Sequence, residues 1–352
     1  MGQLGFFDLS RRYEGLDKKR DPLATLAAVI PWETFRPTLL AALTSQDLRT
    51  PDAERRSRAG RKPWDEVTVF KALVVQALYN LSDEQTEYQL RDRLSFMRFL
   101  GLGIEDDVPD ATTLWLYREA LARAGAVEEL FAAFDSHLRD HGFLAMGGQI
   151  IDATIVVAPR QRNSRDDNAT IKQDLTPPDW DKHPAKRRQK DVDARWTKKH
   201  GRTYYGYKNH VGVDARHKLV RRYTVTDAAR YDGGELDAVL DPCNTCSDVW
   251  ADSAYRSAEI EAGLAERGYR SRIHRRAARN RPLSAREMRG NATRSRVRAR
   301  VEHVFGHQAT AMGGKLVRTI GIARARMKIG MQNLTYNMSR FVHLRGKAAS
   351  PP

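Results

Sequence analysis

Three acidic residues lie in segments where a carboxylate is unexpected. Asp152 interrupts the apolar, β-branched run 149–157, Asp252 ends the predicted strand 248–252, and Glu302 lies in an arginine-rich helical segment. Burying an isolated carboxylate costs several kcal/mol unless a cation, a metal or hydrogen bonds compensate. Asp152 is therefore either a satisfied structural aspartate or a metal ligand. For Glu302 the alternative is an ordinary ion pair with Arg298, one helical turn away.

Three carboxylates with no histidine or thiol ligand beside them suit Mg²⁺ or Mn²⁺, which prefer oxygen ligands. Two such ions about 3.5 to 4 Å apart can activate a water or a 3′-hydroxyl and stabilise the leaving oxygen of a displacement at phosphorus. Residues 270–300 contain 12 arginines and one acidic residue, Glu287. Guanidinium groups there would hold a phosphodiester backbone that the carboxylates alone would repel.

The net charge of +16 belongs to the part of the chain that carries these carboxylates. Residues 1–150 hold 19 Lys and Arg against 23 Asp and Glu, whereas the remaining residues hold 41 against 21. A basic surface of this kind indicates a polyanionic partner.

The elements expected around the carboxylates form a mixed α/β sheet of about five strands. Strands are predicted at 149–157, 204–214, 219–226, 248–252 and 269–274, and short helices at 235–240 and 257–267. If the strands of Asp152 and Asp252 are neighbours, the two carboxylates can share a cation, because ligands bind where such strands end. Residues 160–202 are polar and proline-bearing, which predicts an irregular basic linker that DNA orders. No large insertion is expected between Asp252 and Glu302.

The part of the chain before the sheet is predicted to be all-helical. Residues 1–63 form an N-terminal segment with a basic arm at 55–63, and 64–143 form a helical domain in which Ser82 to Gln85 is a capping box. The arm either lies along a DNA groove or is a solvated linker. The helices allow a DNA-binding helix-turn-helix, but their acidic balance argues against an extensive DNA surface, so this domain is expected to serve in dimerisation, in DNA binding or in both. The sheet domain then spans 144–345, and 346–352 form a tail.

The sequence has no apolar run long enough to span a membrane and no signal peptide, so a cytoplasmic protein is expected. Cys243 and Cys246 form a lone C-x-x-C, too few thiols for a zinc ribbon, and are expected to be reduced and partly buried.

Four strings resemble the DDE transposases of bacterial insertion sequences, specifically the insertion-sequence-five family. They are Ile151-Asp152-Ala153-Thr154, then Tyr205-Gly206-Tyr207-Lys208-Asn209-His210 with Asp214, then Ala251-Asp252-Ser253-Ala254-Tyr255, then Arg298-Ala299-Arg300-Val301-Glu302-His303-Val304-Phe305-Gly306. The N-terminal strings Leu81-Ser82-Asp83-Glu84, Phe99-Leu100-Gly101-Leu102 and Val108-Pro109-Asp110 resemble that family's helical domain, and the string 334–340 resembles its ending. The resemblance covers nearly the whole chain in the same order.

The resemblance implies a ribonuclease-H-like catalytic fold and a DDE triad of Asp152, Asp252 and Glu302 with two Mg²⁺ or Mn²⁺ ions. It implies that a homodimer or higher oligomer, associated with the bacterial nucleoid, binds terminal inverted repeats in double-stranded DNA and then cuts and rejoins them into a target. A catalytically inactive or nuclease-only DNA-binding protein of the same fold is the alternative. The residues expected at DNA are Arg55, Arg56, Arg58, Arg61, Lys62, Lys186, Arg187, Arg188, Lys198, Lys199, Lys208, His210, Arg275, Arg276, Arg294 and Arg298.

Overall fold

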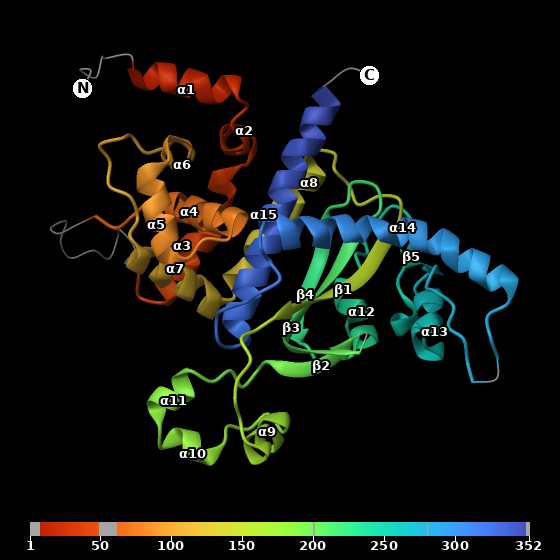
Figure 1. Cartoon of the computed structure of the whole chain (residues 1–352). Helices are drawn as coiled ribbons and strands as arrows, with labels where there is room; N and C mark the ends of the chain where they lie inside the picture. Colours follow the sequence, from red (N-terminus) through yellow and green to blue (C-terminus); the bar gives the residue numbers. More distant parts are fainter. Residues whose placement is uncertain (1–7, 49–61, 200, 280, 350–352) are drawn as a thin grey trace. The chain divides into compact units, whose positions relative to one another are not determined.

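The computed structural model describes residues 8–48, 62–199, 201–279 and 281–349 (Figure 1). The chain divides into two compact units. The first is helical and combines residues 1–134 with 334–352, and the second is the α/β unit of residues 135–333.

The helical unit contains ten helical segments in the described residues, with parts of two long helices shared with the other unit. They are α1 (Asp8–Lys18), α2 (Pro22–Val29), η1 (Trp32–Phe35), α3 (Arg36–Ser45), α4 (Glu66–Tyr79), α5 (Asp83–Asp92), α6 (Leu94–Leu100), α7 (Ala111–Ala124), α8 (Ala126–Asp140) and α15 (Ile322–Ala349). The predicted capping box at Ser82 and Gln85 is confirmed, since both of its hydrogen bonds are present. Buried aromatic rings, including Phe35 and Phe70, form the core of this unit.

The boundaries of the units differ from those expected from the sequence. Residues 8–48 form helices that belong to the helical unit instead of a separate N-terminal segment. The last helix, α15, continues from the α/β unit into the helical unit, where Phe341 packs against Phe134 with ring centroids 6.0 Å apart. A long helix with buried residues at both ends can contribute to two cores, and hydrophobic periodicity alone does not say which core each end joins.

The α/β unit is built on a six-stranded mixed sheet. Its strands are β1 (Gln149–Val157), β2 (Arg195–Lys199), β3 (Arg202–Asp214), β4 (Val220–Asp227), β5 (Asp248–Trp250) and β6 (Arg270–Ser271). β3 pairs antiparallel with both β1 and β4, whereas β5 pairs parallel with β1 and with β6. An antiparallel set extended by two parallel strands is the ribonuclease-H-like arrangement, so the predicted fold class is confirmed.

The sequence missed one strand, because β2 lies inside the segment 160–202 that was expected to be irregular. This segment folds into α9 (Arg165–Lys172), α10 (Pro178–Asp181), α11 (Pro184–Arg188) and β2. Asp191 anchors it: the buried carboxylate accepts hydrogen bonds from the Ala194 N–H (3.0 Å), the Tyr207 hydroxyl (2.7 Å) and the Gly321 N–H (3.2 Å). These partners are distant in sequence, so local polarity could not reveal the order.

Gly206 marks the point where β3 changes partners. Residues 202–206 pair with β2, and residues 207–213 pair with β4. Gly206 has φ +150°, and a Cβ there would lie 2.3 Å from the Val156 carbonyl oxygen. Only glycine fits such a position, because any side chain would collide with the neighbouring strand.

Helices cover both faces of the sheet (Figure 1). α12 (Leu236–Val239) and α13 (Ala258–Glu266) join Ile151 and Val249 in one buried cluster. The opposite face, which carries Asp152 and Val156 by strand alternation, meets α14 (Ala285–Thr310) and the first half of α15. Between Asp252 and Glu302 the described residues form only η4 (Ser253–Tyr255), α13, β6 and the start of α14, which confirms that no large insertion occurs there.

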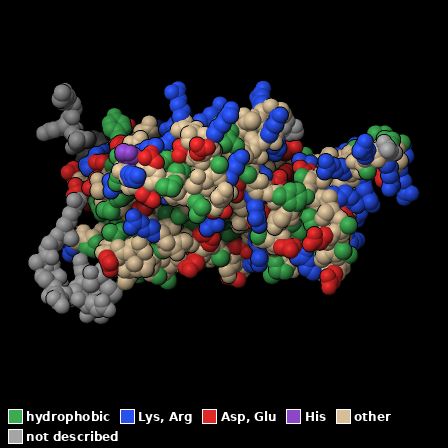
Figure 2. Space-filling model, turned by 90° about the horizontal axis from the view of Figure 1, so that it is seen from below, with side chains coloured by type: hydrophobic (Ala, Val, Ile, Leu, Met, Phe, Trp, Pro, Cys, Tyr) green, Lys and Arg blue, Asp and Glu red, His purple; other side chains and the backbone are tan. Residues whose placement is uncertain are grey.

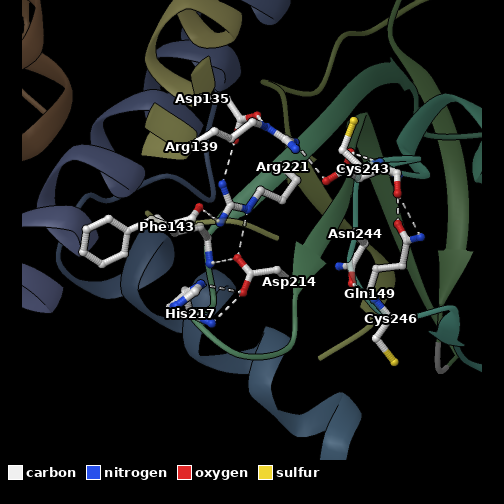
Figure 3. Close-up of polar contacts among 12 residues, drawn as sticks. Asp135, Arg139, Phe143, Gln149, Asp214, His217, Arg221, Cys243, Asn244 and Cys246 are labelled. Carbon is white, nitrogen blue, oxygen red and sulfur yellow. Dashed lines mark hydrogen bonds and ion pairs between the residues drawn. The ribbon is translucent and has the colours of Figure 1, made fainter. Parts of the chain in front are cut away.

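A buried ionic network braces one end of the sheet (Figure 3). The Arg221 side chain, which is 1% exposed, donates to the carboxylates of Asp214 (3.0 Å) and Asp135 (2.9 Å) and to the Phe143 carbonyl oxygen (2.6 Å). Asp214 also accepts hydrogen bonds from the His217 and Leu219 N–H groups. Asp214 is therefore a satisfied structural aspartate, and it serves as a reference for judging Asp152.

Both cysteines are free thiols on the turn before β5. Cys243 is exposed and Cys246 is partly buried, so the expected partial burial holds for Cys246 only. Figure 3 shows their sulfur atoms pointing to opposite sides. Within the described part of the chain, the helices lack the length and apolar character that a bilayer-crossing segment requires.

Candidate active site

Asp152 lies near the centre of β1 and is 9% exposed. Its Oδ1 accepts a hydrogen bond from the Ala153 N–H at 2.9 Å, and its Oδ2 lies 3.3 Å from the Arg298 Nε. Burial raises the pKa of Asp152 above its ordinary value despite the nearby Arg298 guanidinium, and the charge of Asp252 raises it further. Compared with Asp214, this carboxylate is under-compensated, which is typical of a group that binds a cation.

Asp252 lies two residues beyond the end of β5, the parallel neighbour of β1. Ile150 on β1 pairs with Trp250, the last residue of β5, so Asp152 and Asp252 each lie two residues after this pair. Asp252 then caps the 3₁₀ turn η4, because its Oδ1 accepts a hydrogen bond from the Ala254 N–H at 2.7 Å. The prediction that the two strands are neighbours is therefore confirmed.

Glu302 lies on α14, which packs on β1 and β5 through the fully buried Val301 and Val304. The Glu302 side chain itself is exposed. No ion pair joins Glu302 to Arg298, because the Arg298 guanidinium pairs with Asp152 instead. The alternative expected for Glu302, an ordinary ion pair with Arg298, thus does not occur among the described residues.

Among the described residues, no three His, Cys, Asp or Glu side chains come close enough to hold one metal ion. The structure brings Asp152 and Asp252 together and leaves Glu302 outside the pair. Arg298 supplies the positive charge beside Asp152. The two aspartates fit a hard divalent cation, since both are carboxylates and the more buried one lacks the set of donors that Asp214 has.

A cluster of arginines lies beside the aspartates. Arg294 on α14 donates to the Asn291 Oδ1 at 3.3 Å, and its buried Nε has no hydrogen-bond partner. Burial and the positive charges of Arg275, Arg256 and Arg272 lower the pKa of Arg294. Cations held this close to one another favour binding of an anion, and a backbone phosphate is such an anion.

The exposed arginines extend this charge along the loop into α14. Arg275 and Arg276 are exposed, and so are Arg279, Arg281 and Arg286. Figure 2 shows Lys and Arg side chains concentrated at its right-hand side, where Figure 1 places the start of α14 in the α/β unit. This surface is positioned for a polyanion.

Other residues predicted to contact DNA lie in three places. Arg55, Arg56, Arg58 and Arg61 fall outside the described residues, and Lys62 beside them is exposed. Lys198 and Lys199 are exposed on β2, and Lys199 is close enough to Asp152 to act electrostatically on it. On α11, Arg188 is exposed, Arg187 is partly buried, and Lys186 pairs with Asp179 at 3.2 Å.

Lys208 and His210 do not present their charges to a ligand. The Lys208 Nζ contacts the Arg230 carbonyl oxygen at 2.7 Å and the Asp232 carboxylate at 2.8 Å. His210 is fully buried, with its Nε2 2.9 Å from the Thr226 Oγ1, and burial lowers its pKa to about 4. Direct DNA contact by His210 is thus wrong for this structure, because β4 and the following turn cover a side chain that looks available in the sequence.

Sequence reasoning assigned no role to two residues near the aspartates. Arg256 joins Arg272, which belongs to the predicted arginine-rich segment, in the arginine cluster, and Tyr255 has a buried hydroxyl on which the carboxylates act. The signal that could have found Tyr255 and Arg256 is their position directly after Asp252, in the turn that Asp252 caps.

Comparison with known proteins identifies the family of the chain. A family model described as a transposase domain matches residues 11–120, and a model described as a transposase DDE domain matches residues 145–338. The structure is also similar to a piggyBac transposase synaptic complex with hairpin DNA, solved by cryo-EM, at 12% sequence identity with a TM-score of 0.45. That similarity covers 94% of this chain and 77% of the other.

The DDE model spans more than half of the chain, including the paired aspartates, and the other model spans most of the helical unit. Proteins of this family cut and transpose DNA and generally depend on divalent metal ions. The chain therefore belongs to the DDE transposases of the insertion-sequence-five kind, and it is a DNA-cleaving and transposing enzyme.

Proposed function

We propose that this transposase binds the terminal inverted repeats of its element and uses Asp152, Asp252 and Glu302 as metal ligands for strand cleavage and strand transfer. The observation that carries the proposal is that Asp152 and Asp252 each lie two residues after the Ile150–Trp250 pair of the parallel strands β1 and β5. Their negative charges act on one another, since Asp252 raises the pKa of Asp152. Two carboxylates held in this way favour a shared divalent cation.

The ions proposed are Mg²⁺ or Mn²⁺, two for each site. When bound, such ions supply a polarised nucleophile and stabilise the leaving oxygen of the phosphodiester. In this proposal Asp152 and Asp252 coordinate the ions directly. We assign Glu302 as the third ligand, because it lies one helical turn after Arg298, whose guanidinium pairs with Asp152, and its side chain is exposed.

Arg298 has two proposed tasks. Without a metal ion, its guanidinium neutralises Asp152 across 3.3 Å. Once a divalent cation takes over that charge, the guanidinium is able to bind a phosphate oxygen of the DNA end. Arg294, with Arg256, Arg272 and Arg275 around it, holds a neighbouring phosphate.

The remaining DNA surface is proposed from exposed cations. Lys198 and Lys199 on β2, the α11 cations and the arm that ends at Lys62 would follow the backbone away from the reacting phosphate. A homodimer or higher oligomer would bring two element ends together. Its proposed place is the bacterial cytoplasm, in association with the nucleoid DNA that a transposase of this family would cut.

The test uses the full-length chain, Mg²⁺ and a duplex that carries the end of its element. Wild-type protein is expected to cut at the element end and join it to a second duplex. Asp152→Asn is expected to lose at least 1,000-fold in cleavage rate, on the order of a lost metal ligand's effect, while binding the duplex within about twofold. Glu259→Gln, which removes an exposed acid on α13, is the matched control and should cleave normally.

Each result selects one function. Joined products support transposition, hydrolysis without joining indicates a nuclease of the same fold, and a mobility shift without cleavage indicates binding alone. Loss of both binding and cleavage in Asp152→Asn would mean that Asp152 is structural.

A further inference from the structure

Tyr255 has a buried hydroxyl that the protein leaves without a partner. The residue is 1% exposed, and its ring packs in the cluster formed by Ile151, Val249 and Ala251. Its Oη is inaccessible to solvent and has no hydrogen-bond partner. Phenylalanine would fill the same space without leaving a polar group unsatisfied, so packing alone does not explain a tyrosine.

Other buried tyrosines of the same unit do have partners. The Tyr205 hydroxyl donates to the Asp191 carbonyl oxygen at 3.1 Å, and the Tyr207 hydroxyl donates to the Asp191 carboxylate at 2.7 Å. The fold is therefore able to satisfy a buried phenol where the hydroxyl serves structure. An unpartnered one points to a partner that is not part of the chain.

The surroundings of Tyr255 indicate which partner that is. Burial raises the pKa of Tyr255 well above its ordinary value, and the charges of Asp152, Asp232 and Asp252 raise it further. The hydroxyl therefore stays protonated, and the charges of the aspartate pair act on it. Asp232 is paired with Lys208 at 2.8 Å, whereas among the residues that the structure describes the Asp152 and Asp252 pair has one ion-pair partner, Arg298, at 3.3 Å from Asp152.

Tyr255 is also held firmly relative to Asp252. The two residues are the cap and the last residue of one 3₁₀ turn, and the Asp252 side chain fixes that turn through the Ala254 N–H at 2.7 Å. The Tyr231 hydroxyl binds the Ala254 carbonyl oxygen from the other side. A donor on so short and doubly fixed a turn is pre-organised for a ligand of Asp252.

We propose that Tyr255 is a further residue of the cleavage site, whose hydroxyl donates a hydrogen bond to an oxygen atom bound at the Asp152 and Asp252 pair. That oxygen belongs either to a water on the divalent cation or to the phosphate of the DNA end, and both are strong acceptors. The inference rests on the proposed function, because it assumes that the aspartate pair binds a metal ion and a phosphodiester.

The experiment compares wild type with Tyr255→Phe in three measurements. Thermal unfolding in EDTA is expected to give an equal or higher Tm, because the lost hydroxyl had no partner in the protein. Affinity for DNA without metal should change by less than about twofold. Single-turnover cleavage with Mg²⁺ on pre-bound DNA should slow by about 10- to 100-fold, the usual effect of losing one donor to a polarised oxygen.

Binding of Mn²⁺, followed by its electron paramagnetic resonance signal without DNA, separates the two acceptors. Weaker Mn²⁺ binding in Tyr255→Phe assigns the hydrogen bond to the water on the cation. Unchanged Mn²⁺ binding with slower cleavage assigns it to the phosphate. Tyr207→Phe is the matched control, because its hydroxyl has a protein partner and its loss should lower the Tm.

Two results would overturn the inference. One is cleavage by Tyr255→Phe at the wild-type rate, and the other is a clearly lower Tm in EDTA, which would reveal a protein partner for the hydroxyl. Cleavage assays of wild-type and Asp152→Asn protein on the same duplex distinguish failure of this inference from failure of the proposed function. If wild type cleaves, Asp152→Asn does not and Tyr255→Phe matches wild type, only the role of Tyr255 is lost; absence of cleavage by wild type contradicts the proposed function itself.

Discussion

Replacing either of two buried aspartates by asparagine should have different effects on stability, a loss at Asp214 and no loss at Asp152. Asp214 is completely buried, and its carboxylate is paired with Arg221 at 3.0 Å. Removing one partner of such a pair costs about 3 to 5 kcal/mol, because the other charge stays buried. Since Arg221 keeps its contact with Asp135 at 2.9 Å, we expect the lower end of the range for Asp214→Asn, about 3 kcal/mol.

Asp152→Asn should stabilise the metal-free protein or leave it unchanged. Burial raises the pKa of Asp152 in the folded state above that of the unfolded chain. A carboxyl group with a raised folded pKa adds most stability below its unfolded pKa, and that stability is lost as the pH rises through the folded pKa. At pH 7 the charge of Asp152 therefore opposes folding, and asparagine removes it.

The measurement is thermal unfolding of both variants in EDTA at pH 7. A loss of about 3 kcal/mol in a unit of this size lowers the Tm by about 6 to 12 °C for Asp214→Asn. Asp152→Asn should unfold at or above the wild-type Tm and should lose any stabilisation by added Mg²⁺. Equal destabilisation by the two substitutions would refute the reasoning, because Asp152 would then be as well satisfied as Asp214.

Two further predictions follow from the arginine cluster and from the buried histidine. Arg294→Gln should weaken DNA binding and make the slope of log affinity against log salt concentration shallower by about one. The control Arg267→Gln, at the end of α13 where Arg267 pairs with Asp237, should leave the slope unchanged. An unchanged slope for Arg294→Gln would show that Arg294 does not contact DNA. The pKa of His210 is about 4 in the folded protein and about 6.5 in the unfolded chain. The neutral imidazole therefore makes its full contribution to the free energy of unfolding above pH 6.5, and about 3 kcal/mol of this contribution is lost as the pH falls to 4. Denaturant unfolding across that range should show a weaker acid-side loss in His210→Gln, and equal pH dependence would contradict the burial of a neutral imidazole.

Much of the catalytic unit could be predicted from sequence because its signals are local. The run 149–157 is β-branched and apolar on both faces, and β1 occupies the same residues. A carboxylate in such a run stands out, and the order of the strands made Asp252 its expected neighbour. Those inferences need only strand propensity and the cost of burying charge.

The rest depends on contacts that sequence does not display. In the sequence, His210 looks available to a ligand. In the structure it is fully buried on β3, next to the paired strand β4. The strand β2 forms by pairing with the first residues of β3, up to Gly206. The segment that precedes β2 is held by the hydrogen bond from the Tyr207 hydroxyl to the Asp191 carboxylate. The missing partner of the Tyr255 hydroxyl is likewise visible only when every neighbour is known.

The most direct test of the central claim is the anomalous diffraction of Mn²⁺ in crystals of the protein with element-end DNA. The account predicts a peak between the Asp152 and Asp252 carboxylates, coordination by Glu302, and a guanidinium of Arg298 moved from Asp152 to phosphate. A Mn²⁺ ion bound elsewhere, or an Arg298 to Asp152 ion pair that persists with DNA and Mn²⁺ present and Glu302 still facing solvent, would contradict it.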